Sequence, residues 1–477
     1  MMKNSIENLA ANFANDQAFD NLQSKWREMV EGALKGKIFN DTLVKTSEDG
    51  IALGPLFTNA KNTSAIQKPI LPHLANRDWH ITTQIDHPSI DHSNKDMLAD
   101  LEGGASSISL NIDPNGECGI AVRNITDLQR LFSGVYTNLV PLQTVPNTYE
   151  QCALIAAHFQ HHKDRETLYL NLSYPHAGGN EAHLLSLTHW VCENAPHWKA
   201  VTIDAAAIHE RGASPAQELA YMLAKAADIL RPMIKAHGIE TALGLIDVQL
   251  ACDQDAHFGI IKFRAARLLW AKLAEAFGAK PQSQTPTLHA VSSVRMLGKA
   301  DPWANILRLN AACFGAVCGG ANSITLLPFT FRNGLATPFA RRVSRNLQIM
   351  QMEETRLGHV IDPAHGSYMH ESLTHELAHK AWSIFQKIEA IGGWEDGFDW
   401  FMTEVKSTNM ERLRKIKDGE TLLVGVNQYV KPDVRKAKTL PHPKIKKRTG
   451  KIIQANEFSK AIAQASDGYL LPTGKSV

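Results

Sequence analysis

Short apolar runs alternate with longer amphipathic stretches through the middle of this 477-residue chain. The runs are rich in Val, Ile, Leu and Thr, as is typical of strands buried on both faces of a parallel sheet. Eight strands are predicted, at His80–Gln84, Ser106–Ile112, Asn138–Leu142, Leu168–Leu172, Ala200–Asp204, Ala242–Asp247, Thr287–Val291 and Ser323–Leu327. Helices are predicted between them, among others at Thr148–His161, Pro215–Leu230 and Phe258–Phe277. Because parallel strands need helical crossovers, this order predicts a (β/α)8 TIM barrel, an α/β fold.

Segments of a different character flank this barrel and divide the chain into four parts. Residues 1–76 are predicted to form an N-terminal arm with a helix at Ser24–Leu34, and residues 77–337 the barrel. Residues 338–430 are predicted to form a C-terminal helical extension, with helices at Pro338–Leu357 and Leu373–Ile391. The second of these helices carries apolar residues at three- and four-residue spacing, which indicates a core-facing stripe. Residues 431–477 form a basic tail.

The basic tail concentrates charge that the net value of +2 conceals. Between Lys431 and Lys451 there are nine Lys or Arg and one acidic residue, Asp433. The simplest interpretation is a solvated, partly disordered tail, and docking onto an acidic partner is the alternative. Nucleic-acid binding is disfavoured because the segment lacks interleaved aromatic residues.

Composition indicates an intracellular globular protein. Hydrophobic residues make up 44% and charged residues 21% of the chain, which are ordinary globular values. The apolar runs are too short for a membrane span, and the N-terminus does not resemble a signal peptide. The six cysteines are scattered without CxxC spacing, which predicts free thiols and no metal site. We therefore expect a cytoplasmic protein with no membrane association.

A series of motifs in fixed order carries the most specific information. From Ser293 to Gly393 the series contains Asp301-Pro302-Trp303-Ala304-Asn305, Gly319-Gly320-Ala321-Asn322-Ser323-Ile324, Phe339-Ala340-Arg341-Arg342-Val343-Ser344-Arg345-Asn346, Glu353-Glu354 and Asp362-Pro363 before Gly366-Ser367. Elsewhere it includes Asp49-Gly50-Ile51, Arg77 with Trp79, Arg264-Ala265-Ala266-Arg267 and Gly425-Val426-Asn427. This ordered set, over about residues 25–430, resembles the substrate-binding barrel of the methylmalonyl-CoA mutase family.

The resemblance implies chemistry that needs two pieces: a barrel that holds the acyl-CoA, and a separate cobalamin-binding domain with a D-x-H-x-x-G loop. Two stretches come near that loop, Asp255–Gly259 and Asp362–Gly366, but both have the wrong spacing. We therefore expect no cofactor on this chain, and adenosylcobalamin on a partner chain of the complex.

The catalytic positions implied by the resemblance are also altered. The Tyr-His pair of catalytic members falls on Ala206 and Ala207, and His209 is the only nearby substitute, interpreted as an ordinary polar loop residue. Other altered positions are Gln84 in place of a tyrosine, Leu245 and Asp247 in place of a CoA-binding Arg-x-Ser, and Val291 in place of a glutamine. Losing guanidinium and amide donors removes groups that hold phosphate or carboxylate. The candidate substrate-binding residues that remain are Gln84, Ser107, His289 and Asn322.

These departures lead to a hypothesis about function. The run Leu101–Ser107 resembles the small-subunit version of the second strand. We therefore expect a non-catalytic small (β-type) subunit in a complex that interconverts methylmalonyl-CoA and succinyl-CoA. It would work as a hetero- or homodimer, most simply paired with a catalytic mutase large subunit. One alternative is a catalytic acyl-CoA mutase barrel that works with a separately encoded cobalamin-binding chain. Another is an acyl-CoA-binding or regulatory protein.

Overall fold

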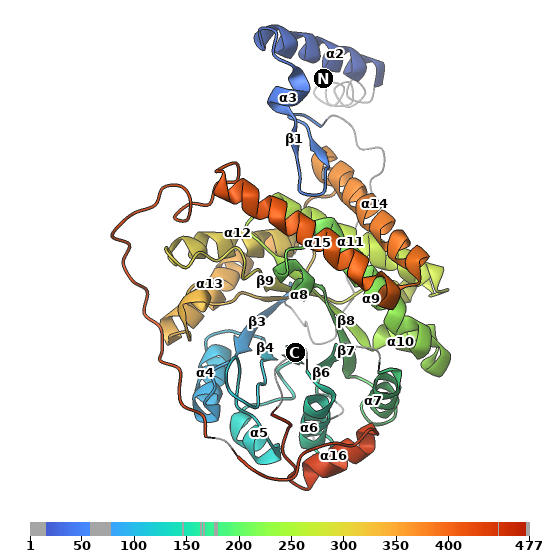
Figure 1. Ribbon diagram of the computed structural model, residues 1–477, viewed down its shortest axis with the longest axis vertical. Coiled ribbons are helices and arrows are strands. Elements are labelled where there is room, and N and C mark those ends of the chain that lie inside the picture. The colour runs from blue at the N-terminus through green and yellow to red at the C-terminus, as the bar shows by residue number, and fades with distance from the viewer. Residues whose placement is uncertain are drawn as a thin grey trace, which may run out of the picture.

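The computed structural model describes residues 16–57, 78–145, 147–162, 165, 167–175, 180–446 and 448–473. Eight strands surround a central axis (Figure 1), and every neighbouring pair among them is parallel. They are β3 (His80–Ile85), β4 (Ser107–Leu110), β5 (Leu142–Thr144), β6 (Asn171–Tyr174), β7 (Lys199–Asp204), β8 (Ile246–Cys252), β9 (Leu288–Ser292) and β10 (Ser323–Thr325).

The strands close into a barrel. Their order is β5-β4-β3-β10-β9-β8-β7-β6, so the first and last strands in sequence, β3 and β10, are neighbours. The two ends of this order meet where Leu142 forms a parallel bridge with Leu170 and its amide donates to the Tyr169 carbonyl at 2.9 Å. The predicted (β/α)8 barrel is therefore confirmed.

Three predicted strands are displaced along the chain, and one of them moves from Leu168–Leu172 to Asn171–Tyr174. The strand expected at Asn138–Leu142 is observed at Leu142–Thr144, and the strand expected at Ala242–Asp247 is observed at Ile246–Cys252. In the second case Ala242 and Leu243 belong to the short helix α10 (Ile239–Gly244). A short buried apolar run has the same periodicity in a strand and in a buried helix turn, so the pattern alone misplaced the boundary.

Helices alternate with the strands and continue after β10. Around the barrel they are α4 (Ile90–Glu102), α5 (Ile125–Leu131), α6 (Tyr149–Phe159), α7 (Glu181–Asn194), α8 (Ala205–Glu210), α9 (Pro215–His237), α10, α11 (Ala256–Ala276) and α12 (Ala304–Cys318). Then follow α13 (Pro338–Glu353), α14 (Tyr368–Ile391), α15 (Trp394–Lys417) and α16 (Phe458–Ser466), with 3-10 turns at Pro281–Ser283, Phe331–Asn333 and Leu357–His359. None of the helices in the described residues is long and apolar enough to span a membrane.

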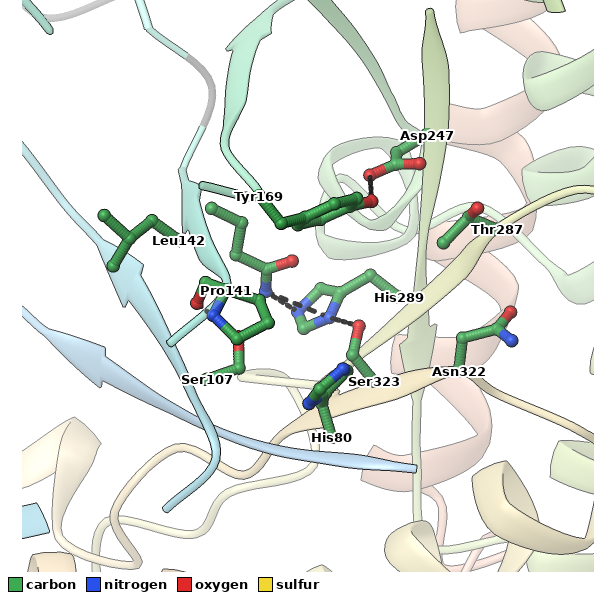
Figure 2. A pocket seen from close by; sticks show the side chains of 11 residues that line it. His80, Ser107, Pro141, Leu142, Tyr169, Asp247, Thr287, His289, Asn322 and Ser323 are labelled. Atoms are coloured by element: carbon green, nitrogen blue, oxygen red, sulfur yellow. Dashed lines mark hydrogen bonds between the residues drawn. The ribbon is translucent and has the colours of Figure 1, made fainter. Parts of the chain in front are cut away.

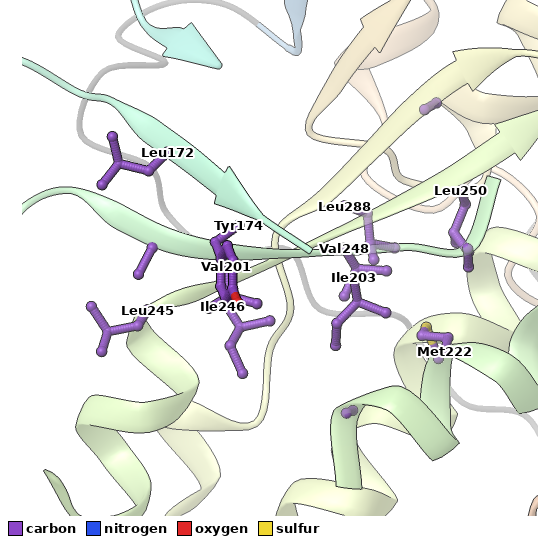
Figure 3. Packing of buried hydrophobic residues seen from close by; sticks show 14 of the residues in the cluster. Leu172, Tyr174, Val201, Ile203, Met222, Leu245, Ile246, Val248, Leu250 and Leu288 are labelled. Carbon is purple, nitrogen blue, oxygen red and sulfur yellow. The ribbon is translucent and has the colours of Figure 1, made fainter. Parts of the chain in front are cut away.

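The main core lies between the strands and this outer layer of helices. Alternate residues of β7 and β8, such as Val201, Ile203 and Val248, face outward in the layer that also holds Met222 of α9 (Figure 3). The start of α9 is fixed locally by a capping box, in which Ser214 and Gln217 satisfy each other's backbone amides. Pro215 at the first helical position adds to this signal because it lacks the amide that would be left unpaired there.

The N-terminal arm stands away from the barrel at the top of Figure 1. It consists of α2 (Asp16–Ala33), α3 (Phe39–Leu43) and a hairpin of β1 (Lys45–Thr46) and β2 (Ala52–Leu53). The tip of the hairpin contacts the helical extension of the barrel. There Glu48 forms a bidentate ion pair with Arg412 of α15, at 2.6 and 2.7 Å. Arg77, which the sequence motif paired with Trp79, lies outside the described residues.

The basic tail is held on the barrel at several points. Lys446 accepts a hydrogen bond from Arg123 through its carbonyl, and Arg448 pairs with the buried Asp127 at 2.9 Å. Farther on, α16 packs against α6 and α7, with Phe458 fully buried. Most described residues between 431 and 451 are nevertheless exposed, and the contacts with Arg123 and Asp127 hold this stretch on the barrel at two points. A charge run does not reveal which of its cations find buried carboxylates.

Candidate functional site

The inside of the barrel is lined by polar side chains. Along β6 to β10 most outward positions are apolar, whereas inward positions carry Asn171, Thr202, Asp247, His289 and Ser323. Typical barrels of this class fill the interior with Val, Ile and Leu. A polar interior indicates a lumen whose side chains either contact a ligand or satisfy one another.

In this chain the polar side chains satisfy one another across the lumen. Gln143 of β5 places its Nε2 atom 3.1 Å from both ring nitrogens of His289 on β9. Figure 2 shows His289 between Tyr169 and Ser323. In the order of the strands β5 and β9 are four places apart, so they stand on opposite walls and the contact crosses the barrel. His289 Nδ1 also lies 2.7 Å from Ser323 Oγ on β10. Burial lowers the pKa of His289 to about 3, so its ring is neutral at pH 7 and can accept from the amide.

A second polar group lies beside this one. Asn171 donates to Asp247 Oδ2 at 2.9 Å and to Thr202 Oγ1 at 3.0 Å. The hydroxyl of Tyr169 donates to the same carboxylate oxygen at 3.4 Å, and Lys199 Nζ lies 3.7 Å from Asp247 Oδ1. Burial raises the pKa of Asp247, and the nearby Lys199 opposes that shift. The carboxylate is thus engaged by the protein itself.

Little space remains between these groups. The cavity at the amino-terminal end of the strands has a volume of about 20 Å³, which suits on the order of one water molecule. Its lining comprises His80, Ser107, Pro141, Leu142, Gln143, Tyr169, Asp247, Thr287, His289, Asn322 and Ser323. Pockets that bury a cofactor-sized ligand measure roughly 300 to 1,000 Å³. Among the described residues, this cavity is too small to hold an acyl-CoA.

Three of the four predicted substrate-binding residues meet at this cavity. Ser107, His289 and Asn322 line it, although they come from distant parts of the sequence. Gln84 does not, because it lies near the carboxyl end of β3, where its amide donates to Asp86 at 3.4 Å. The sequence reasoning missed Gln143, since the predicted strand ended at Leu142. Gln143 lies between the buried Leu142 and Thr144, and this alternation of buried and partly exposed positions was the signal that could have found it.

The altered catalytic positions lie elsewhere, in α8 at the carboxyl end of β7. Ala206 is buried and Ala207 is exposed, and neither carries a group that could polarise a carbonyl. His209 ends up in the interior, 1% exposed, rather than on the surface as an ordinary loop residue. The barrel lumen and His209 therefore belong to different sites.

His209 is part of a buried network that superficially has the order of a hydrolase triad. Its Nε2 lies 2.8 Å from Ser293 Oγ, and its Nδ1 lies 3.4 Å from Glu218 Oε2. However, Lys262 Nζ already donates to Glu218 at 2.6 Å, and Ser293 and Glu218 are fully buried. Burial raises the pKa of Glu218, but Lys262 and His209 outweigh it and lower the value to about 2. A nucleophile that no substrate can reach does not act as one, so this network is structural.

The two near-matches to the cobalamin loop are occupied by local contacts. Asp255 caps α11 by accepting from the Phe258 amide at 3.0 Å, and His257 Nδ1 lies 3.1 Å from His370 Nε2. His365 Nδ1 lies 3.1 Å from Glu371. These residues do not fit the role of a lower cobalt ligand. In the part of the chain that the structure describes, no group of three or more His, Cys, Asp or Glu is arranged to hold a metal ion.

Comparisons with known proteins agree with the sequence motifs. The family model described as methylmalonyl-CoA mutase matches residues 171–467. The chain is 32% identical to the methylmalonyl-CoA mutase small subunit of Streptomyces virginiae over 486 residues, which cover 95% of this chain and 78% of that protein. It is 32% identical to the small subunit of Propionibacterium freudenreichii subsp. shermanii over 391 residues, 78% of this chain and 60% of that protein. A methylmalonyl-CoA mutase of Cereibacter sphaeroides is 27% identical over 460 residues, 85% of this chain and 64% of that protein.

Proposed function

Because the chain belongs to the methylmalonyl-CoA mutase family, we propose that it is a non-catalytic barrel subunit of a mutase complex. At the level of the family the reaction is an isomerisation that depends on cobalamin. In the complex, a catalytic large subunit would hold the acyl-CoA and the cofactor. This chain would support that subunit structurally.

The observation that carries the proposal is the contact of Gln143 with His289 across the lumen, at 3.1 Å. A substrate that passes along the axis has to displace this contact, and Asp247 and Tyr169 further narrow the same level of the barrel. Displacement would leave the partly buried Gln143 amide without this acceptor, while His289 would keep its contact with Ser323; losing a hydrogen bond of this kind costs about 1–3 kcal/mol. The lumen is therefore closed by interactions that favour the fold.

The loss of hydrogen-bond donors at the altered catalytic positions also supports a non-catalytic role. Polarising a thioester carbonyl requires a donor placed at the oxygen where charge develops, and such donors are worth roughly 3–4 kcal/mol. Ala206 and Ala207 offer no side-chain donor, and His209 is turned toward Ser293 and Glu218. The names of the small-subunit relatives add independent support.

The proposal is tested with the purified full-length chain. We expect no isomerisation of methylmalonyl-CoA with added adenosylcobalamin, no spectral change on cobalamin titration, and no calorimetric heat of methylmalonyl-CoA binding. We expect a stable complex with a catalytic mutase large subunit. Activity restored by a cobalamin-binding chain alone would contradict the proposal. It would support the alternative of a catalytic barrel with a separate cobalamin chain, because this barrel would then be the one that holds substrate.

A further inference from the structure

The loop at residues 422–430, which follows α15 and contains the motif Gly425-Val426-Asn427, has no part in the lumen and yet is firmly held. The Asn427 side chain accepts from the Leu423 amide at 2.6 Å and donates to the carbonyls of Ile416 and Thr421 at 2.8 and 2.7 Å. Arg308 of α12 donates to the Val424 carbonyl at 2.6 Å. The loop is thus fastened both to the end of α15 and to α12.

This firmly held 422–430 loop presents apolar side chains to solvent. Those with large exposed fractions are Leu422, Val424, Val426, Tyr429 and Val430. Tyr429, 77% exposed, also adopts a left-handed backbone with φ of 53°. That conformation is uncommon for a bulky residue and persists only where the surroundings impose it. Several exposed apolar side chains within nine residues of one hydrogen-bonded loop indicate an interaction site.

The 422–430 loop lies at the end of a helix that also touches the arm. Arg412 of α15 holds Glu48 of the arm's hairpin, and Met410 and Leu413 on the same helix are 62% and 56% exposed. On the arm, Met29 and Ile38 are exposed as well. In Figure 1 the hairpin of the arm points toward α15. Exposed apolar side chains therefore occur on the arm, on α15 and on the 422–430 loop, and the arm and α15 are linked by the Glu48–Arg412 ion pair.

Cationic residues follow the 422–430 loop in the sequence. Among the described residues, no carboxylate lies within ion-pair distance of Lys431, Lys436 or Lys438, whereas Arg448 farther along is paired with Asp127. Unpaired cations beside an apolar centre are the arrangement that complements a partner surface with an apolar centre and a carboxylate border.

We infer that the 422–430 loop is a docking surface for the catalytic mutase subunit, whose contacting face is apolar at its centre and acidic toward Lys431–Lys438. This inference rests on the proposed function, and adds to it the place where the partner binds. The exposed Tyr429 and Val430 form the centre of the contact, since ordered aromatic residues carry much of the free energy of binding at interfaces. The cations set the rate of encounter.

Binding of the full-length chain to a catalytic mutase large subunit, measured by biolayer interferometry, tests the inference. The double variant Tyr429→Asn, Val430→Ser removes the apolar centre, and asparagine tolerates the left-handed backbone at position 429. The matched control is Tyr136→Asn, Leu139→Ser, at two side chains that are 75% and 73% exposed in the loop before β5. Circular dichroism and thermal unfolding establish that both variants fold.

We expect the first variant to raise Kd by about 10-fold or more and the control to change it by less than about twofold. Lys431→Glu, Lys436→Glu should slow association at low salt and flatten its dependence on ionic strength. Equal affinities of the two double variants would overturn the docking surface while leaving the proposed function intact. A wild-type chain that forms no complex with the large subunit would overturn both.

Discussion

Asp49 at the tip of the arm's hairpin accepts a hydrogen bond from the hydroxyl of Ser214, the N-cap residue of barrel helix α9. Asp49 Oδ2 also lies 3.2 Å from the Ala216 amide. A carboxylate at a helix N-terminus is stabilised by the unpaired amides and the helix dipole. A residue of the arm thus completes the cap of a helix in the barrel.

Replacing Asp49 should loosen this attachment. In Asp49→Ala the amides at the start of α9 lose an acceptor, and we expect the free energy of unfolding to fall by about 1–2 kcal/mol. Urea denaturation measures this loss, and limited proteolysis should cut the arm sooner. Asp41→Ala, at an exposed carboxylate of α3, is the control and should leave both unchanged.

The same carboxylate should make stability depend on pH. Burial raises the pKa of Asp49 from 3.8 to about 6, against the opposing hydrogen bonds from Ser214 and Ala216. Between these values the folded chain holds a proton that the unfolded chain has lost. The contribution of Asp49 to the free energy of unfolding therefore falls as pH rises through this window and is constant above it. Asp49→Asn should remove this part of the slope in denaturation experiments at pH 4–7, and identical slopes in both proteins would contradict the assignment.

Breaking the contact across the lumen should destabilise the barrel. In Gln143→Ala the ring of His289 loses the amide that faces it at 3.1 Å, and a cavity remains. We expect a loss of about 1–3 kcal/mol in the free energy of unfolding. Gln160→Ala, which removes a hydrogen bond to Ser466 near the surface, should cost less than about 0.5 kcal/mol. A neutral Gln143→Ala would show that the lumen contact contributes little to the fold.

The crossing of α11 and α12 should not tolerate a side chain at Gly315. A Cβ atom there would lie 2.9 Å from the Ala256 carbonyl oxygen and 3.3 Å from the Gly259 Cα atom. Because backbone atoms cannot rotate away, Gly315→Ala should destabilise the protein by about 1–3 kcal/mol, seen as a lower Tm. Gly244→Ala is the control, since nothing lies within 4 Å of a Cβ at that position.

Removing the outer arm should weaken assembly without unfolding the barrel. A chain that lacks residues 1–43 keeps the hairpin with Glu48 and Asp49 but loses α2, α3 and the exposed Met29 and Ile38. We expect this chain to fold and to bind the catalytic subunit at least about 10-fold more weakly in sedimentation equilibrium. Undiminished binding would mean that the arm is not part of the interface.

The barrel fold could be predicted from the sequence, but the side-chain contacts inside the barrel could not. Strand order followed from the alternation of buried runs with helices, because only a few topologies obey the rules for parallel crossovers. Ser107, His289 and Asn322 were candidates from the family resemblance, and the structure shows that they line one cavity at the amino-terminal ends of their strands. Gln143 was missed, because its partner His289 is 146 residues away and no local pattern encodes a contact between opposite walls.

Burial of His209 could not be foreseen either, and for a related reason. Polar residues in turns are usually solvated, and only the tertiary structure shows that Ser293, Glu218 and Lys262 surround this one. The same holds for the tail, where Asp127 is supplied by a helix more than three hundred residues away from Arg448.

The contact between Gln143 and His289 has a mechanical consequence. A ring of eight strands held only by neighbour-to-neighbour bonds can deform into an oval, because each bond tilts a little. A hydrogen bond between side chains on opposite walls, such as that between Gln143 and His289, opposes this deformation because flattening the barrel would stretch or break it. The contact between Gln143 and His289 therefore also opposes flattening of the barrel, and with it a change in the spacing of the outer helices, α15 included.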